Sequence, residues 1–357
     1  MSKSTIEGSE QRHTAIARLT LSTAEREELT GLVDEALTGP QALPVEHQLG
    51  RLAVLAHRLP ERVRETLTEF RLTGRPYGGL VLAGLPLDES ALGPTPASYS
   101  EVTDRPELHR ATALLALLAS LLGDPFSFLS QQKGQLFLDV FPVTQHENDQ
   151  LGSSSTVELD WHNEDAFHED RADWIMLLCL RNHDLVPTTF ATTEALPLDA
   201  ETVRTLFARR FVILPDESHT ASFNQATTGV TDDAMQQLAF DLIADLNTGK
   251  HHIPILTGDP QAPMIRIDPA FMQRDLGDEE AERAQQVLID TFARRMTDVP
   301  LTTGELLVVD NKRAVHGRRP FKARYDGTDR WLRRTNITAD LRRTEGRRGG
   351  SHGRAVV

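Results

Sequence analysis

Cysteine is nearly absent from this sequence: Cys179 stands alone, so no internal disulfide can form. It lies in the apolar run Trp174–Leu180, where a buried structural thiol is expected, and a chain without disulfides suits a reducing cytoplasm. No apolar run approaches the roughly 20 residues that cross a bilayer, and the first residues lack the hydrophobic stretch of a secretion signal. We therefore expect a soluble cytoplasmic protein without a membrane partner.

Basic residues are also scarce relative to acidic ones. The chain has 38 Lys and Arg against 52 Asp and Glu, which gives a formal net charge of -14. Such a charge repels the phosphates of nucleic acids, so we expect no nucleic-acid partner. Several arginines gather in residues 341–357, where glycine is frequent and apolar periodicity is missing. We predict a flexible basic tail there.

Sequence repeats, a Walker motif and a GxGxxG before a helix are all missing. What is present is Leu and Val at helical spacing, followed by short apolar runs between turn residues. The helical pattern covers Ser22–Leu37, Glu46–Leu72, Leu108–Leu122, Asp232–Leu246 and Asp278–Met296. The strand pattern covers Gly78–Gly84, Gln135–Phe141, Asp173–Leu180, Phe211–Pro215 and Glu305–Asp310.

This order of helices first and then strands with long inserts favours an α+β fold with an antiparallel β core, and it argues against alternating βαβ units. Apolar residues make up 39% of the chain, enough for a sizeable core. We predict one elaborated domain over residues 21–340, between a flexible N-terminus at 1–20 and the tail at 341–357. The sequence leaves a homodimer open.

His162 and Glu164 stand two residues apart in a segment dense in metal-binding side chains. Residues two apart on an extended chain project to the same side, so one metal ion can receive both. A distant histidine, His316, follows a predicted core strand and turn. Two histidines and one carboxylate form a face that leaves three coordination positions for a co-substrate and dioxygen.

Arg330 follows His316 by fourteen residues. Taken alone, such an arginine is most often part of a surface salt bridge. Near a metal it has a task, because 2-oxoglutarate chelates iron through its keto-acid end and leaves its other carboxylate for a guanidinium to grip. The spacing therefore predicts a 2-oxoglutarate site.

With these residues the chain resembles the clavaminate synthase-like family of iron(II)/2-oxoglutarate oxygenases, in particular its branch of free amino-acid hydroxylases. The resemblance spans about Gln131–Asp340. Its motifs are His162-Asn-Glu164-Asp-Ala-Phe167, Leu180-Arg181, Asp310-Asn-Lys-Arg-Ala-Val-His316-Gly-Arg318 and Asp326-Gly-Thr-Asp-Arg330-Trp-Leu-x-Arg334. The resemblance implies a double-stranded β-helix (jelly-roll) core with a helical N-terminal cover and helical inserts.

The resemblance also implies a set of ligands. Iron(II) would bind to three side chains: His162, Glu164 and His316. The far carboxylate of 2-oxoglutarate would lie on Arg330, assisted by Thr188 or by its neighbour Thr189, and dioxygen would complete the set of reactants.

By the same resemblance, Arg334 receives the α-carboxylate of an amino-acid substrate. Gln131 and Glu164 lie near its α-amino group, and Ser218 lies on a lid that closes over it.

The other histidines are weaker candidates for binding a metal or substrate. His168, His183 and the pair His251-His252 have no partner at ligand spacing, so loop or surface roles are expected. His219, next to Ser218, could touch substrate, but nothing else in the sequence supports that.

The far end of the substrate is less defined. Relatives that hydroxylate arginine or lysine hold the cationic end with an Asp-x-Asp pair, and here the matching stretch has Asp268 followed by Ala270. One carboxylate can pair with an ammonium or guanidinium, or accept hydrogen bonds from a urea group. The loss of the second carboxylate weakens the arginine assignment and leaves lysine and citrulline open.

We therefore expect hydroxylation at C3 or C4 of a free L-amino acid with a long basic or urea-bearing side chain, in antibiotic-type biosynthesis. One alternative is a carrier-tethered or larger intermediate, with hydroxylation, desaturation or cyclisation. Another is a non-catalytic metal- or ligand-binding β-barrel, or a zinc hydrolase that uses the same ligands. The absence of HExxH and of an evident Ser-His-Asp set speaks against a hydrolase.

Overall fold

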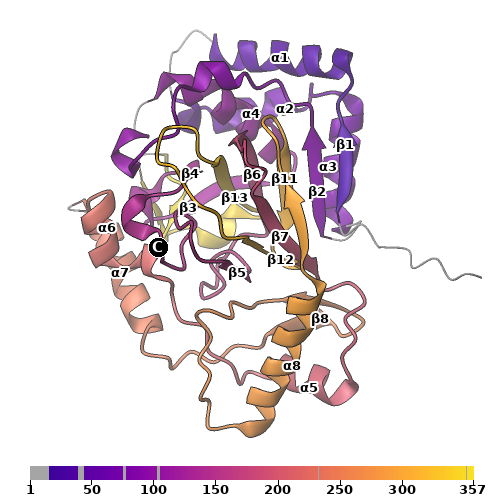
Figure 1. The fold of residues 1–357 in the computed structure, drawn as a ribbon, viewed down its shortest axis with the longest axis vertical. Helices are drawn as coiled ribbons and strands as arrows, with labels where there is room; N and C mark the ends of the chain where they lie inside the picture. Colours follow the sequence, from indigo (N-terminus) through magenta and orange to yellow (C-terminus); the bar gives the residue numbers. More distant parts are fainter. Residues whose placement is uncertain (1–15, 39–43, 75–77, 103–104, 232, 351) are drawn as a thin grey trace, which may run out of the picture.

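The computed structural model describes residues 16–357, except 39–43, 75–77, 103–104, 232 and 351. In this part of the chain two facing sheets form the centre, with helices at both ends and along one side (Figure 1). None of the described helices is long and apolar enough to span a membrane.

The larger sheet is mixed and contains most of the strands. In sheet order they are β1 (Ala17–Thr20), β2 (Gly79–Ala83), β11 (Leu306–Asp310), β6 (Trp174–Arg181), β13 (Trp331–Thr338), β3 (Asp124–Phe128), β15 (Ala355–Val356) and β14 (Arg348–Gly349). A further strand, β4 (Leu138–Val140), pairs with β13. The central pairs, β2 with β11, β11 with β6, and β6 with β13, are antiparallel.

The smaller sheet has the order β10 (Thr297–Pro300), β7 (Pro187–Thr192), β12 (Ala314–Arg318), β5 (Leu159–His162), all antiparallel. Its inner face meets the larger sheet in an apolar cluster that includes Leu177, Phe190 and Leu332. Two facing sheets whose central strands are antiparallel, closed over such a core, form a jelly roll, so the predicted α+β double-stranded β-helix is confirmed. A separate hairpin, β8 (Leu256–Asp259) and β9 (Ala262–Ile265), lies outside both sheets.

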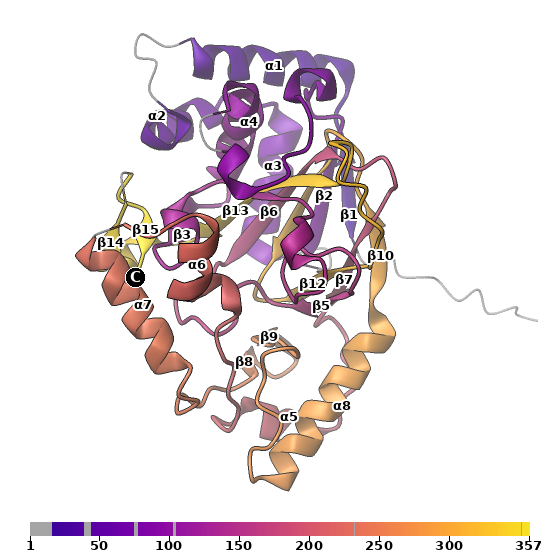
Figure 2. The ribbon, with the colours of Figure 1, turned by 60° about the vertical axis from the view of Figure 1, so that its left-hand side comes forward.

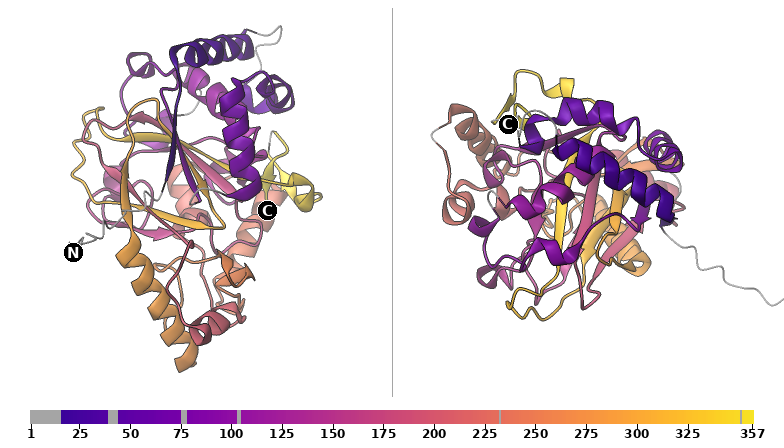
Figure 3. Two further views of the ribbon diagram at one scale, coloured as in Figure 1. Left: turned by 90° about the vertical axis from the view of Figure 1, so that its right-hand side faces the viewer. Right: turned by 90° about the horizontal axis from the view of Figure 1, so that it is seen from above.

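Four helices from the first third of the chain cover the outer face of the larger sheet (Figure 3). They are α1 (Thr23–Leu37), α2 (Leu49–Ala56), α3 (Glu61–Thr73) and α4 (His109–Ala119). Helix α1 begins at a capping box, in which the backbone N–H of Ser22 donates to Glu25 Oε2 at 2.7 Å. The continuous helix predicted over Glu46–Leu72 is wrong: Pro60 divides it into α2 and α3, because proline lacks the N–H that a helix interior needs.

The remaining helices are inserts. They are α5 (Ala200–Phe207), α6 (Ala221–Thr227), α7 (Ala234–Leu246) and α8 (Glu279–Arg295). Helices α5 and α8 pack together at the end of the molecule away from α1 (Figure 1), while α6 and α7 lie along one side (Figure 2). The short 3-10 helices are η1 (Val45–His47), η2 (Glu89–Leu92), η3 (Tyr99–Glu101), η4 (Pro106–Leu108), η5 (Gln132–Gly134), η6 (Thr144–His146), η7 (Glu217–His219) and η8 (Leu341–Thr344). The strand predicted at Phe211–Pro215 is wrong, since only isolated bridges form there.

Both predicted flexible ends need correction. Residues 1–15 lie outside the described residues, but Ala17–Thr20 form β1, which pairs in parallel with β2. The C-terminal segment is folded: β15 pairs in parallel with β3, and Ala355 and Val356 are fully buried. The many arginines and glycines of residues 341–357 mask three apolar residues at the end of the chain, near the label C in Figure 2. Ala355 and Val357 pack with residues of α7, and Val356 packs in the core with residues of β3.

A buried charge tests whether the C-terminal segment belongs to the core. Val356→Asp places a carboxylate where the side chain is 0% exposed, whereas Val54→Asp changes a residue that is 72% exposed. We expect Val356→Asp to lower the free energy of unfolding by about 3 kcal/mol or more and Val54→Asp by less than about 0.5 kcal/mol. Urea unfolding followed by circular dichroism measures both, and equal midpoints would mean that the segment adds nothing to the core.

Candidate active site

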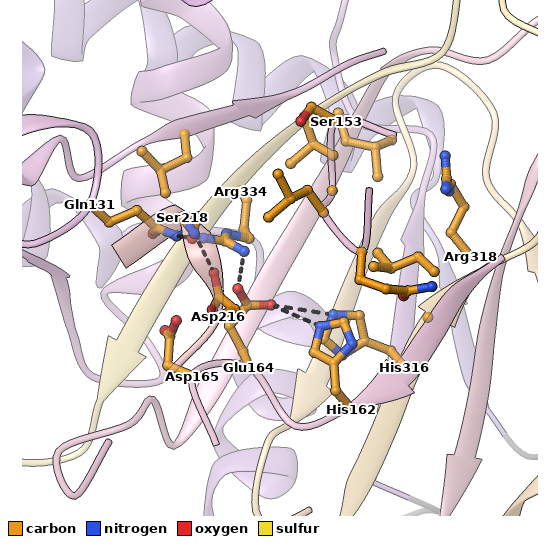
Figure 4. A pocket seen from close by; sticks show the side chains of 18 of the residues that line it. Gln131, Ser153, His162, Glu164, Asp165, Asp216, Ser218, His316, Arg318 and Arg334 are labelled. Atoms are coloured by element: carbon orange, nitrogen blue, oxygen red, sulfur yellow. Dashed lines mark hydrogen bonds and ion pairs between the residues drawn. The ribbon is translucent and has the colours of Figure 1, made fainter. Parts of the chain in front are cut away.

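Two histidines meet on neighbouring strands of the smaller sheet. His162 ends β5 and His316 lies in β12, and the antiparallel register pairs the two residues directly. Directly opposite residues of such a pair project to the same face of the sheet. Their ring centroids are therefore only 4.7 Å apart, and both rings face the space between the two sheets (Figure 4).

Glu164 joins this pair, although not from a strand as expected. Strand β5 ends at His162, and Glu164 lies in the turn that follows. Two fully buried asparagines hold the turn, and sequence reasoning assigned them no role. Asn311 Oδ1 accepts a hydrogen bond from the backbone N–H of Glu164 at 2.8 Å. The Asn163 amide donates to the carbonyl oxygens of Asn311 and Ala314, each at 2.9 Å.

The spacing of the three side chains suits one divalent cation. Glu164 Oε2 lies 3.8 Å from His162 Nε2 and 3.4 Å from His316 Nε2. Two atoms that each lie about 2 Å from one ion can be no more than about 4 Å apart. His162 Nδ1 donates to the carbonyl oxygen of Asp160 at 2.7 Å, which leaves its Nε2 lone pair for a metal.

The charges around these residues also favour a cation. Burial raises the pKa of Glu164, but the Arg334 charge and the two histidines hold it well below its usual range. Burial lowers the pKa of His162, yet Glu164 and Asp268 raise it to about 9. The raised pKa of His162 means that the surrounding acidic groups favour a positive charge at this place. A bound metal ion would supply that charge in place of the proton on His162.

The predicted co-substrate residues lie together beside the histidines. Arg330 immediately precedes β13, and its guanidinium donates to Thr188 Oγ1 at 3.0 Å. This contact selects Thr188 over Thr189. Arg330 is buried, burial lowers its pKa to about 10, and its Nε has no hydrogen-bond partner among the described residues. A buried guanidinium without a carboxylate fits a ligand that brings one, as 2-oxoglutarate does.

Arg318 is a second buried arginine on this side, and sequence reasoning gave it no role. Its guanidinium donates to the Ser154 hydroxyl at 2.9 Å and to the Val157 carbonyl oxygen at 3.0 Å, and it lies over the Phe321 ring. Figure 4 shows it apart from the metal-binding residues. Burial and the nearby Arg330 charge lower its pKa to about 9. Arg318 therefore holds the 154–157 loop and adds positive charge near Arg330.

Arg334 lies in β13, four residues after Arg330 and on the same face of the strand. It forms an ion pair with Glu164 and donates to Gln131 Oε1 at 3.2 Å. The Gln131 amide in turn donates to Ser218 Oγ at 2.8 Å. Four side chains predicted to meet the amino and carboxyl groups of a substrate thus form one connected network (Figure 4).

Asp268 lines the same pocket, beyond His162. Burial raises its pKa to about 7, His162 opposes that shift, and the neighbouring carboxylate of Asp216 adds to it. Neither acid forms an ion pair with a lysine or arginine within the described residues. Sequence reasoning missed Asp216, although it adjoins the predicted lid residues. The exposed Ala270 adds no charge.

The nine side chains predicted as site residues all line this single pocket. They are Gln131, His162, Glu164, Thr188, Ser218, Asp268, His316, Arg330 and Arg334. Two other histidines lie outside this set. His168 lies in a loop but is buried, with Nε2 donating to the Val357 carbonyl oxygen at 3.2 Å. His219 is fully buried and does not line the pocket.

Comparison with known proteins adds independent support. Residues 250–336 match the family model described as taurine catabolism dioxygenase TauD, TfdA family. Enduracididine beta-hydroxylase from Streptomyces hygroscopicus is 41% identical over 290 residues, which cover 81% of this chain and 84% of that protein. L-ornithine/L-arginine 3-hydroxylase from Catenulispora acidiphila is 38% identical over 288 residues, covering 80% of this chain and 84% of that protein.

A solved structure is similar over nearly the whole chain. The crystal structure of the non-heme iron oxygenase OrfP in complex with Fe, succinate and (3S)-hydroxy-L-Arg superimposes with a TM-score of 0.87. The sequence identity is 39%, and the match covers 95% of this chain and 99% of that chain. OrfP has also been solved with Fe and alpha-ketoglutaric acid.

Removal of one histidine tests the metal site. We expect His316→Ala to weaken Fe(II) binding by at least about 100-fold, because two remaining ligands hold an ion far less firmly than three. His251→Ala is the matched control, since this exposed histidine pairs with Asp245 away from the pocket. Anaerobic calorimetric titration with Fe(II) measures both variants. Equal affinities would rule out His316 as a ligand.

Proposed function

The chain belongs to the free amino-acid hydroxylase branch of the clavaminate synthase-like iron(II)/2-oxoglutarate oxygenases, and on that premise we propose that it hydroxylates C3 of an arginine-type L-amino acid. Its class is settled: it is an iron- and 2-oxoglutarate-dependent enzyme acting on free basic amino acids, not a non-catalytic barrel or a zinc hydrolase. The proposal concerns the particular amino acid, the carbon and the residues that select them.

One observation carries the choice of a cationic substrate. Asp268 and Asp216 both line the pocket, the Asp216 charge helps to raise the pKa of Asp268, and neither is paired with a lysine or arginine in the described residues. Two such carboxylates need a cation, and a guanidinium can satisfy both because it presents five N–H donors in a planar fork. Asp216 thus supplies the second carboxylate that Ala270 lacks. A neutral citrulline side chain would leave the charges uncompensated.

The other end of the substrate would be held by the connected network. Arg334 is the only guanidinium of that network, so it would receive the α-carboxylate, while Gln131 and Ser218 would accept hydrogen bonds from the α-ammonium group. Contacts at both ends fix the carbon chain in one orientation past the metal face. A free α-carboxylate is part of this recognition, which disfavours a carrier-tethered substrate.

On the other side of the metal, Arg330 and Thr188 would hold the far carboxylate of 2-oxoglutarate. His162, Glu164 and His316 would hold iron(II) and leave the positions that face the pocket open. When bound, iron and 2-oxoglutarate with dioxygen supply the oxidation, in which 2-oxoglutarate loses carbon dioxide to become succinate as the substrate gains a hydroxyl group.

The choice of C3 is supported by relatives. Enduracididine beta-hydroxylase and L-ornithine/L-arginine 3-hydroxylase carry that position in their names, as does an L-lysine 3-hydroxylase at 31% identity. A role in antibiotic-type biosynthesis fits the first of these relatives. The net charge of -14 and the single buried cysteine support a cytoplasmic enzyme without a nucleic-acid or membrane partner, and they leave a homodimer open.

A substrate screen tests the proposal directly. Protein reconstituted anaerobically with Fe(II) is given 2-oxoglutarate, air and one of L-arginine, L-lysine, L-ornithine, L-citrulline or L-asparagine. We expect L-arginine to give the highest kcat/KM and a product heavier by one oxygen atom, with at least about tenfold discrimination against citrulline. A preference for citrulline or asparagine would refute the cationic assignment. A product lighter by two hydrogens would indicate desaturation.

The pH dependence of substrate binding tests Asp268. Its pKa of about 7 means that the carboxyl group is largely protonated below that pH. A cationic side chain binds the ionised form, so the Kd for L-arginine should rise by about tenfold for each pH unit below 7 and level off above it. Asp268→Asn should bind weakly throughout and lose this inflection. Anaerobic calorimetry with Fe(II) and 2-oxoglutarate present measures both, and an unchanged profile in the variant would exclude Asp268 as its source.

A further inference from the structure

His219 is a fully buried histidine that lies behind the pocket wall and does not line the pocket. It ends the short helix η7, and the residue before it, Ser218, faces the pocket. Helix α6 follows directly and contributes Phe223 to the same wall. Residues 216–227, here called the wall segment, are an insert between the strands of the jelly roll, so their position depends on contacts with the core.

Both ring nitrogens of His219 have partners in the core. Nδ1 lies 2.8 Å from Ser130 Oγ, and Nε2 lies 3.0 Å from Asp165 Oδ1. The edges of Phe128 and Phe167 close around the ring, with centroid distances of 5.6 and 4.8 Å. A buried imidazole with both nitrogens satisfied has one favoured position and orientation, because any shift leaves a polar group unpaired.

The two partners adjoin the substrate-binding residues. Ser130 precedes Gln131, whose amide donates to Ser218, and Asp165 follows Glu164, which pairs with Arg334. His219 thus connects the wall segment to both chain positions at which the amino end of a substrate would be held. Any rotation of the wall segment about this point would move Ser218 away from Gln131.

A metal site at this place is disfavoured by the same contacts. Asp165, Asp216 and His219 place potential ligand atoms within 4.8 Å of one another. Both His219 nitrogens are already engaged, however, and the second oxygen of Asp165 accepts from the Asn336 amide at 2.9 Å. The cluster is therefore closed by protein donors and acceptors.

We propose that His219 is a positioning residue, which clamps the wall segment so that Ser218 and Asp216 meet the substrate and 2-oxoglutarate is consumed only together with hydroxylation. This inference rests on the proposed function, because it concerns the same amino-acid site. His219 forms no hydrogen bond with Arg330 or Thr188 among the described residues, so we expect its loss to leave 2-oxoglutarate binding nearly unchanged. Loss of the clamp should separate succinate formation from product formation.

Four variants separate the contributions of the two hydrogen bonds of His219. His219→Ala removes both contacts, and Ser130→Ala removes only the Nδ1 partner. His219→Asn can place an amide group near Ser130, while His219→Gln can reach toward Asp165. His251→Ala again serves as the control, because that histidine is exposed and lies outside the pocket.

Three measurements are made on each folded variant: KM for L-arginine, Kd for 2-oxoglutarate, and the ratio of succinate to hydroxylated product. For His219→Ala we expect KM to rise by about tenfold or more, the ratio to rise above about three, and the 2-oxoglutarate Kd to stay within about twofold. Ser130→Ala should lie between this variant and the wild type. His219→Gln or His219→Asn should restore part of the coupling.

A wild-type KM and ratio in folded His219→Ala would overturn the proposal, as would an equal loss of 2-oxoglutarate affinity, which would indicate general damage to the core. Should His219→Ala not fold, Ser130→Ala and His219→Gln decide the outcome by the same criteria.

Amide hydrogen exchange of residues 216–227 in the metal-free protein gives a readout that needs no turnover. We expect faster exchange in His219→Ala and in Ser130→Ala than in the wild type and in His251→Ala. If the wild type turns over no amino acid, the proposed function fails, and this comparison still tests the clamp. Unchanged exchange in both variants would exclude the clamp even if the proposed function holds.

Discussion

The active site depends on the pairing of β5 with β12, because that register sets His162 directly opposite His316. Two imidazoles from distant parts of the chain are thus brought together by neighbouring strands of one sheet. Glu164 is added by a turn that Asn163 and Asn311 fasten to the same sheet. The three candidate metal ligands are thus supported by the sheet, whereas the residues proposed to select the substrate lie partly on inserts around it.

Charge is divided across this face. Arg330 and Arg318 are buried near each other without carboxylate partners among the described residues, and Asp268 and Asp216 line the same pocket without a paired lysine or arginine. Arg334 is ion-paired with Glu164 and lies beside Gln131 and Ser218 (Figure 4). The two buried arginines suit a carboxylate, such as the far carboxylate of 2-oxoglutarate. The two aspartates suit the cationic side chain of an amino acid. The cost of leaving these charges unpaired in a low-dielectric site favours complementary ligands over neutral ones.

The fold could be anticipated where periodicity is strong and local. Helix α4 and strands β6 and β11 lie where their apolar patterns placed them, since burial on every side needs a nearly continuous apolar run. Predictions failed where one residue or a distant partner decides. Pro60 interrupts an otherwise uniform helical pattern, and the last strand forms only because β3 is available to pair with it. The arginine-rich residues that precede β15 contain no local pattern that would indicate its pairing with β3.

The sequence alone pointed to the candidate ligands of the site. His162, Glu164, His316 and Arg330 could be predicted to lie together, as they do, because metal and carboxylate binding require particular side chains at particular spacings. Tertiary structure decided what depends on neighbours: that Thr188 and not Thr189 meets Arg330, that Asp216 stands near Asp268, and that His219 lies behind the pocket wall and not in it. These outcomes follow from strand orientation and from contacts of the inserts with the core, which join residues too far apart in the chain for any local pattern to report.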